Sequence, residues 1–173
     1  MKKLLLAAVI GVAAAACTVV DRTRDARLEP GAKWAILPIA NHTETPQAGL
    51  RAEAIAEAVL RSMGVSQLER YPSAMNPEGL FDPAERKSQE QAVGWAKDQK
   101  VRFALSGSVE EWRYKVGVDG EAAVGLTLSI VDLETGAVVY SAAGGKSGWS
   151  REALSAVAQK LTRELLSGVQ LGR

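Results

Sequence analysis

The sequence predicts a single α/β domain in which helices pack on a mixed sheet, with the element order β-α-β-α-β-β-β-α. Two observations carry this prediction. From residue 33 to residue 100, short apolar runs alternate with two stretches of helical spacing, and each of these two stretches is opened by a proline. After residue 100 the pattern changes to alternating apolar and polar residues, interrupted by two turn sequences, before a last helical stretch.

The first strand and the first helix open the predicted domain. The run Lys33–Asn41 is short and apolar, as in a buried strand, although Pro38 has no amide hydrogen to offer a neighbour. Thr45 followed by Pro46 is typical of a helix N-cap, and Gly64 suits the end of the same helix. Apolar residues three and four apart form its expected inner face: Leu50, Ala54, Ile55, Ala58, Val59 and Met63.

A weaker strand signal, Val65–Pro72, leads into a loop and then into the second helix. Asp82–Glu85 has the form of a capping box with proline at the first helical position, so a helix is expected to about Lys97. Its apolar stripe is modest: Ala84, Ser88, Ala92, Trp95 and Ala96.

Three antiparallel strands and a helix are expected to complete the domain. The first strand runs over Val101–Tyr114, an Asp-Gly turn returns the chain into the second, and the turn Leu133–Gly136 leads into the third. The final helix is expected from Arg151 to about Leu166. Its inner face contains Leu154, Val157, Ala158, Leu161 and Leu165.

The first 16 residues read as a secretory signal. Lys2 and Lys3 precede an uncharged run that ends in alanines directly before Cys17, and this run is too short to span a bilayer. Residues 17–32 are mostly polar or charged and end in a Pro-Gly pair, so we expect a tether before a single domain over residues 33–173. Without the signal the chain has one acidic residue more than it has basic ones, which does not favour nucleic-acid binding.

Cys17, the only cysteine, directly follows the alanines and resembles the lipidated cysteine of bacterial lipoproteins. That resemblance implies that Cys17 becomes the first mature residue and carries a diacylglycerol thioether and an amide-linked acyl chain such as palmitate. Several acyl chains together give durable membrane attachment. Thr18 replaces the aspartate that would hold such a protein in the inner membrane, so the expected location is the periplasmic face of the outer membrane.

Catalytic, metal and cofactor chemistry find little support in the sequence. The only histidine, His42, lies in the loop after the first strand, and we find no phosphate-binding loop, metal-ligand spacing or hydrolase motif. Glu110 and Glu111 are neighbours in a strand, so they are expected on opposite faces rather than as an acid/base pair. Asp119 and Glu121 flank a turn, where carboxylates are also common for local reasons alone.

Several stretches resemble the PelC family, the outer-membrane lipoproteins of the Pel exopolysaccharide secretion system. They are "WAILPIANHTETPQAGLRAEAIAEAVL", "ALSGSVEEWRYKVGVDGE", "LSIVDLETGAVVYSAAG" and "SGWSRE". A broader likeness to CsgG-like and TolB amino-terminal domains bears on the fold alone. The resemblance implies a ring, a dodecamer, that is tethered beneath the outer membrane and associated with the porin PelB.

The resemblance also implies a cargo and a route for it. Pel is a partly deacetylated polymer of N-acetylgalactosamine units that is cationic near neutral pH and contributes to the biofilm matrix. An acidic lumen would collect such a polymer, because identical charges repeated around one axis raise the local concentration of a cation. We expect Asp119 and Glu121 to face this lumen.

Trp149 has two interpretations. If Ser150 caps the last helix, Trp149 and Leu154 occupy the two positions of a hydrophobic staple. In the other interpretation the indole lies at the boundary between membrane and water, which tryptophan prefers, and the PelC resemblance favours this one.

Further alternatives concern the surface and the function. Arg113 and Lys115 either belong to a subunit interface or protect a strand edge against aggregation. The alternative function is that of a single-copy lipoprotein, resembling LpoB, that activates a cell-wall-synthesising enzyme. A periplasmic enzyme acting on glycans would need two carboxylates in one pocket, which the spacing does not predict.

Overall fold

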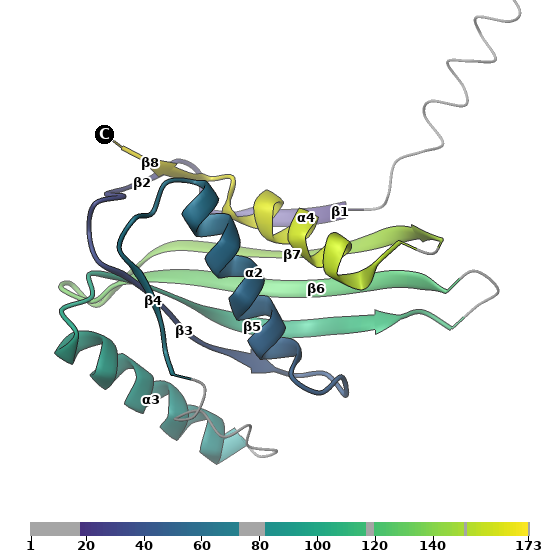
Figure 1. Cartoon of the computed structure of the whole chain (residues 1–173), viewed down its shortest axis with the longest axis horizontal. Helices are drawn as coiled ribbons and strands as arrows, with labels where there is room; N and C mark the ends of the chain where they lie inside the picture. The colour runs from purple at the N-terminus through teal and green to yellow at the C-terminus, as the bar shows by residue number, and fades with distance from the viewer. Residues whose placement is uncertain (1–17, 73–81, 117–119, 151, 173) are drawn as a thin grey trace, which may run out of the picture.

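The computed structural model describes residues 18–72, 82–116, 120–150 and 152–172, without the side chains of residues 82–86 and 150. A mixed sheet of six strands in the order β1-β7-β6-β5-β3-β4 forms the centre of the molecule (Figure 1). Its strands are β1 (Thr18–Arg22), β3 (Trp34–Asn41), β4 (Leu68–Arg70), β5 (Phe103–Tyr114), β6 (Glu121–Asp132) and β7 (Ala137–Ser150). The predicted α/β class with helices on a mixed sheet is confirmed.

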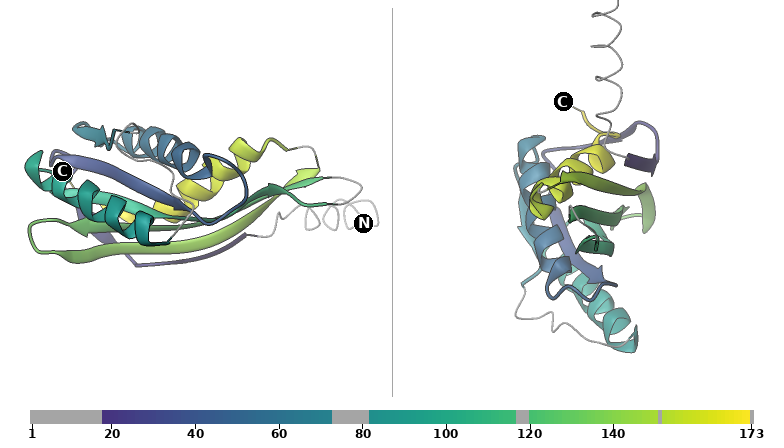
Figure 2. Two further views of the ribbon diagram at one scale, coloured as in Figure 1. Left: turned by 90° about the horizontal axis from the view of Figure 1, so that it is seen from below. Right: turned by 90° about the vertical axis from the view of Figure 1, so that its right-hand side faces the viewer.

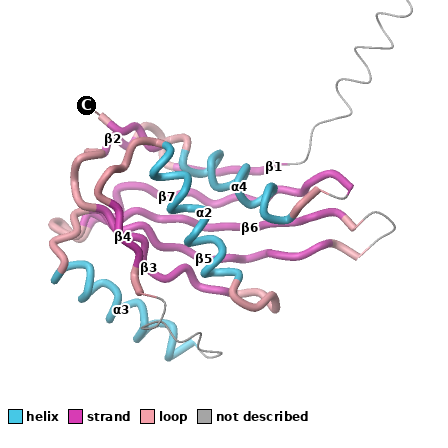
Figure 3. Tube along the Cα trace, viewed as in Figure 1, coloured by secondary structure: helices cyan, strands magenta, loops and turns pink. Residues whose placement is uncertain are grey.

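The long strands β5, β6 and β7 form an antiparallel meander that runs the length of the domain (Figure 3). On the side away from β6, β5 pairs in parallel with β3. Strand β3 in turn pairs in parallel with β4. The asparagine at the end of β3 pairs with Val109, so β5 continues past β3 and its last five residues have no β3 partner. This end of the sheet, where β5 and β7 end and β6 begins, is called the hairpin end below.

Helices cover both faces of the sheet, but unequally. Helices α2 (Ala48–Ser62) and α4 (Leu154–Leu166) lie side by side on one face and enclose the main core, whereas α3 (Asp82–Asp98) covers part of the other face near β3 (Figure 2). Strand β3 is therefore buried on both sides: Trp34 and Ile36 belong to the main core, and Ala35 and Leu37 to the smaller one.

The inner face of α2 differs from the predicted one. Its buried residues are Ala48, Gly49, Ala52, Glu53, Ala56, Val59 and Leu60. Of the predicted residues, Val59 is buried, and Ile55 and Met63 are partly buried against the main core. The cause is a close approach to β3. A β-carbon on Gly49 would overlap the carbonyl of Ile39, and the carboxylate of Glu53 accepts the Ile39 amide hydrogen at 3.1 Å, where the register shifts around Pro38. The position of α2 is thus set by contacts that a search for large apolar residues overlooks.

The predicted N-cap of α2 is also wrong. Gln47, with a left-handed φ of 60°, precedes the first helical residue, and no side chain caps the helix. The hydroxyl of Thr45 instead donates to the carbonyl of Trp112 in β5 at 2.5 Å. The threonine therefore ties the loop before α2 to the sheet.

The segment that we expected to be a tether joins the fold. Strand β1 pairs with β7 from Thr18 to Arg22, and β2 (Ala26–Leu28) pairs in parallel with β8 (Val169–Leu171), a strand that the sequence did not predict. Glycine makes the first pairing close: a β-carbon on Gly144 would lie 2.5 Å from the carbonyl of Val19. Polar composition therefore did not prevent ordering here, because the edge of β7 satisfies the backbone of β1.

Strand β7 and helix α4 also meet differently from the prediction. The strand runs to Ser150, and the residue before the helix is Ala153, which offers no capping side chain. Trp149 consequently lies in a strand, and its interpretation as a hydrophobic staple is wrong. The predicted inner face of α4 is largely correct, since Val157, Ala158, Leu161 and Leu165 are buried.

The packing of α2 predicts opposite effects for two glycine substitutions. Gly49→Ala should destabilise the fold by about 2 kcal/mol or more, because the methyl group overlaps the β3 backbone. Gly94→Ala in α3 meets nothing within 4 Å and should stabilise the protein by about 0.5–1 kcal/mol through helix propensity. Denaturant unfolding of a soluble form that starts at Thr18 measures both, and equal midpoints for the two variants would contradict this account of α2.

Candidate functional site

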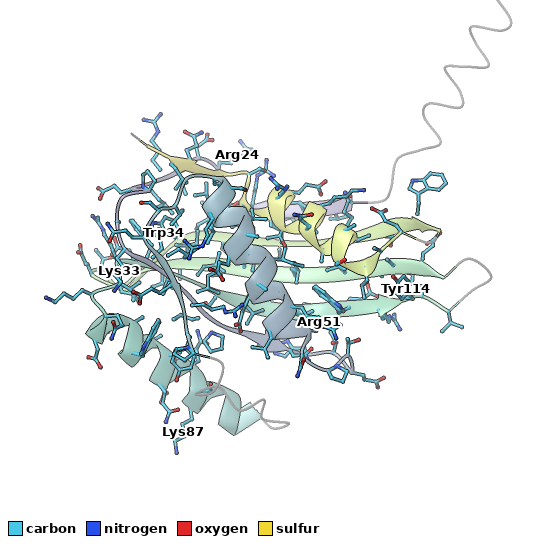
Figure 4. The ribbon with its side chains drawn as sticks, in the orientation of Figure 1. Arg24, Lys33, Trp34, Arg51, Lys87 and Tyr114 are labelled. Carbon is cyan, nitrogen blue, oxygen red and sulfur yellow. The ribbon has the colours of Figure 1, made fainter. Side chains whose placement is uncertain are left out.

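The hairpin end brings together the predicted site residues that the structure describes. Glu121 starts β6 and pairs with Ser150, the residue after Trp149. Arg113 lies at the adjacent end of β5, and Lys115 directly follows that strand. Tyr114 and Trp34 mark the two opposite ends of the sheet (Figure 4). Residues far apart in the sequence thus converge because the meander aligns the end of one hairpin with the end of β7.

Trp149 is held by its backbone while its indole is exposed. Its amide donates to a carboxylate oxygen of Glu152 at 3.2 Å, and the Glu152 amide donates to the Trp149 carbonyl at 2.9 Å. A hydrogen bond from Lys160, followed by the one from the Trp149 amide, lowers the pKa of Glu152, so this carboxylate is ionised near neutral pH. The side chain of Trp149 is 56% exposed, which leaves the ring free to contact another surface.

Glu121 is exposed beside this turn, and its carbonyl accepts the amide hydrogen of Lys115 at 2.7 Å. Asp119 lies outside the described residues. The hairpin therefore presents at least one exposed carboxylate next to the strand end that carries Trp149.

Arg113 and Lys115 each have a partner within the chain. The Arg113 guanidinium donates to Glu111 at 2.9 Å, and the Lys115 ammonium donates to the hydroxyl of Ser147 at 2.7 Å, across β6. Both side chains are exposed, Arg113 on the part of β5 that extends past β3 and Lys115 just after its end. The edge-protection interpretation fits this geometry, because this part of β5 has no strand on its outer side.

Cys17 lies outside the described residues, but its neighbour Thr18 is firmly bound. Thr18 pairs with Lys146 in β7, and the Lys146 ammonium donates to the Thr18 hydroxyl at 2.7 Å and to Glu164 of α4 at 2.8 Å. Sequence reasoning missed Lys146, because nothing in the sequence indicates that Thr18 reaches the sheet. The predicted lipidation residue is thus covalently joined to the edge strand at the hairpin end.

Glu110 and Glu111 do not point to opposite faces, contrary to the prediction. A bulge between Val109 and Glu111 places both side chains beside Gly125, where an added β-carbon would lie 3.5 Å and 3.4 Å from theirs. A bulge adds one residue to one strand, which cancels the usual alternation.

The two carboxylates have separate partners. Glu110 accepts hydrogen bonds from the Ser108 hydroxyl and lies 3.2 Å from His42 Nδ1, whereas Glu111 pairs with Arg113. The hydrogen bond from Ser108 is the main cause that lowers the pKa of Glu110. A general acid needs a raised pKa, so this pair does not resemble a glycosidase site.

Two further features lie elsewhere. A cavity of about 220 Å³ opens between α3 and the sheet, with mainly apolar walls that include Leu37, Val93 and Leu133, and it contains none of the predicted site residues. Within the described parts of the chain, no cluster of three or more histidine, cysteine or acidic residues is arranged to hold a metal ion. No described helix is both long and apolar enough to cross a membrane.

Comparison with solved structures identifies close relatives. The PelC dodecamer from Paraburkholderia phytofirmans is 42% identical, with a TM-score of 0.77, and the match covers 91% of this chain and 100% of that one. A variant of that dodecamer has the same identity and TM-score and is matched over 90% of this chain and 100% of its own. Lipoprotein GNA1162 from Neisseria meningitidis shares the fold alone, with 17% identity, a TM-score of 0.56 and coverage of 79% of this chain and 96% of that one.

Neither the protein-family models nor the curated proteins include a match. The solved relatives decide the assignment, because identity of 42% extends over the whole length of the Paraburkholderia chain. The chain belongs to the PelC family.

Proposed function

We propose that this protein is a ring-forming lipoprotein of the outer membrane that guides cationic Pel polysaccharide through an acidic lumen toward the porin PelB. The similarity to a PelC dodecamer at 42% identity over 91% of the chain is the observation that carries this proposal. No feature of the hairpin end favours the alternative, an LpoB-like activator that acts as a single copy.

The ring is the part of the proposal by which the weak attraction of a single surface carboxylate for a cation becomes strong enough to guide a polymer. A single exposed carboxylate attracts a cation only slightly in water, and salt screens it within about 8–10 Å. A closed ring repeats that carboxylate around one axis, so the field adds up along the path of the polymer. The proposal therefore depends first on the assembly.

Native mass spectrometry of the soluble form that starts at Thr18 tests the assembly. We expect a closed oligomer of twelve chains, the number in the Paraburkholderia relative. A monomer at high protein concentration would contradict the ring and favour the activator.

The proposed lumen predicts a specific export defect. Asp119→Asn combined with Glu121→Gln should lower Pel export several-fold while the ring stays assembled, because the attraction for the cationic polymer is lost. Glu90→Gln combined with Asp98→Asn is a matched control, since both residues are exposed on α3, away from the hairpin end. Export is measured as secreted polymer per cell, and an equal loss in both double variants would refute the lumen assignment.

Membrane contact by Trp149 predicts quenching by lipid-borne quenchers. Trp34 and Trp112 are buried, so the difference in quenching between the native chain and Trp149→Phe isolates the exposed indole. In liposomes that carry the lipidated protein, we expect quenching to fall strongly in the variant. If both proteins are quenched to the same extent, Trp149 does not meet lipid.

A further inference from the structure

Exposed apolar side chains gather at the hairpin end. Among the described residues, the large apolar side chains with the greatest exposure are Val19, Tyr114, Val116, Val138 and Trp149. All except Val138 belong to the hairpin end or to β1 beside it; Val138 lies at the opposite end of β7, near the turn from β6. Exposed apolar residues that cluster in one place, rather than scatter singly, indicate a contact surface.

Val116 is the most exposed of these residues. It is fully exposed and follows Lys115, whose amide donates to the Glu121 carbonyl just beyond the last pair between β5 and β6. Since Glu121 in turn pairs with Ser150, Val116 reaches at least as far along the sheet as Trp149 does. A surface that meets the indole of Trp149 is therefore within reach of Val116.

The position of β1, which directly follows the proposed lipidation residue, indicates that this surface is the membrane. It is bonded to β7 from its first residue, and the Lys146 ammonium, whose side chain is only 11% exposed, holds the Thr18 hydroxyl and Glu164 together. The Arg22 guanidinium donates to the Glu164 carbonyl at 3.1 Å, which ties the other end of β1 to α4. The residue that precedes Thr18 therefore has no flexible linker between it and the folded domain.

The distances involved are short. Strand β7 continues three residues from Lys146, the partner of Thr18, to Trp149, which is about 10 Å at roughly 3.3 Å per residue. The preceding residue lies within about 3.8 Å of Thr18, one Cα spacing. A lipid attached at that residue leaves room for the hairpin end to touch the membrane and little room for it to move away.

The charged side chains near Val116 are compatible with a position among the lipid head groups. Lys115 extends its ammonium along the same end of the sheet to Ser147, and a lysine beside an apolar residue can keep its charge in water while its stem lies along the lipid. Glu121 contributes the opposite charge at this level. The surface is thus mixed in charge and apolar at its tip, as in proteins that lie at a membrane interface.

We infer that β1 is a rigid anchor arm, and that this arm seats a second apolar contact, Val116, in the lipid surface beside Trp149. The inference rests on the proposed lipidation of Cys17. It adds that the orientation of the domain on the membrane is set by main-chain pairing rather than by a loose tether.

A spin label tests the position of Val116. Because Cys17 is the only cysteine and its thiol is consumed by the lipid, Val116→Cys provides a single free thiol for a nitroxide in the full lipidated protein. Val138→Cys is the matched control, an exposed valine at the opposite end of the sheet. On liposomes, the Val116 label should collide several-fold more with oxygen than with a water-soluble nickel chelate, relative to the Val138 label; equal accessibility at the two positions overturns the contact.

A linker insertion tests the rigid arm. Eight glycine and serine residues between Cys17 and Thr18 should leave the protein bound to floating vesicles but move the accessibility of the Val116 label toward that of the Val138 label. The same insertion between Glu134 and Thr135, in the turn from β6 to β7, should leave the Val116 signal unchanged. An unchanged signal with the first insertion overturns the rigid arm, whereas failure of the uninserted protein to float overturns the proposed lipidation itself.

Discussion

The continuous main-chain pairing of β6 with both β5 and β7 is the constraint on which the rest of the structure depends. Ten residues of β6, from Ala123 to Asp132, have a paired strand on each side, so the meander extends past β3 and carries the hairpin end. The two helices α2 and α4 bury one face of this ladder, and Leu126, Leu128 and Ile130 alternate into that core. The position of Trp149, Glu121 and Lys115 relative to one another follows from strand register, not from contacts among the three side chains.

The fold could be predicted where the spacing of apolar residues and the residues at the turns indicate the same element. The alternation in β5 and β6 and the helical spacing of Leu161 and Leu165 each indicated one structure, and the element order followed from them. The inner face of α2 could not be predicted, since it depends on Gly49 and Glu53, residues that make contact through small size and through a hydrogen bond to the backbone. Strands β1 and β8 were missed for a related reason: their stability comes from partners more than a hundred residues away, which leave no local pattern.

The candidate site was predicted in its parts but not in its arrangement. Trp149 and Glu121 were singled out separately, by an exposed aromatic and by a turn carboxylate, and only the pairing of β6 with β7 places them side by side. The bulge beside Gly125 shows the limit of alternation rules, because one extra residue in β5 moved Glu111 to the face of Glu110. No sequence pattern pointed to Val116 or Lys146 as part of the site. Val116 is an ordinary valine, and Lys146 acquires its partners only in the folded sheet.

The pairing of both chain ends with late elements imposes an order on maturation. Thr18 meets Lys146 across 128 positions of sequence, and β2 meets β8 within the last few residues of the chain. The segment that begins at Thr18 therefore stays unpaired until the late elements β7 and β8 are available to it. In the proposed lipoprotein, the enzyme that attaches lipid to Cys17 would have access to it during this interval, and completion of the sheet would afterwards withdraw the adjoining strand β1 from further processing.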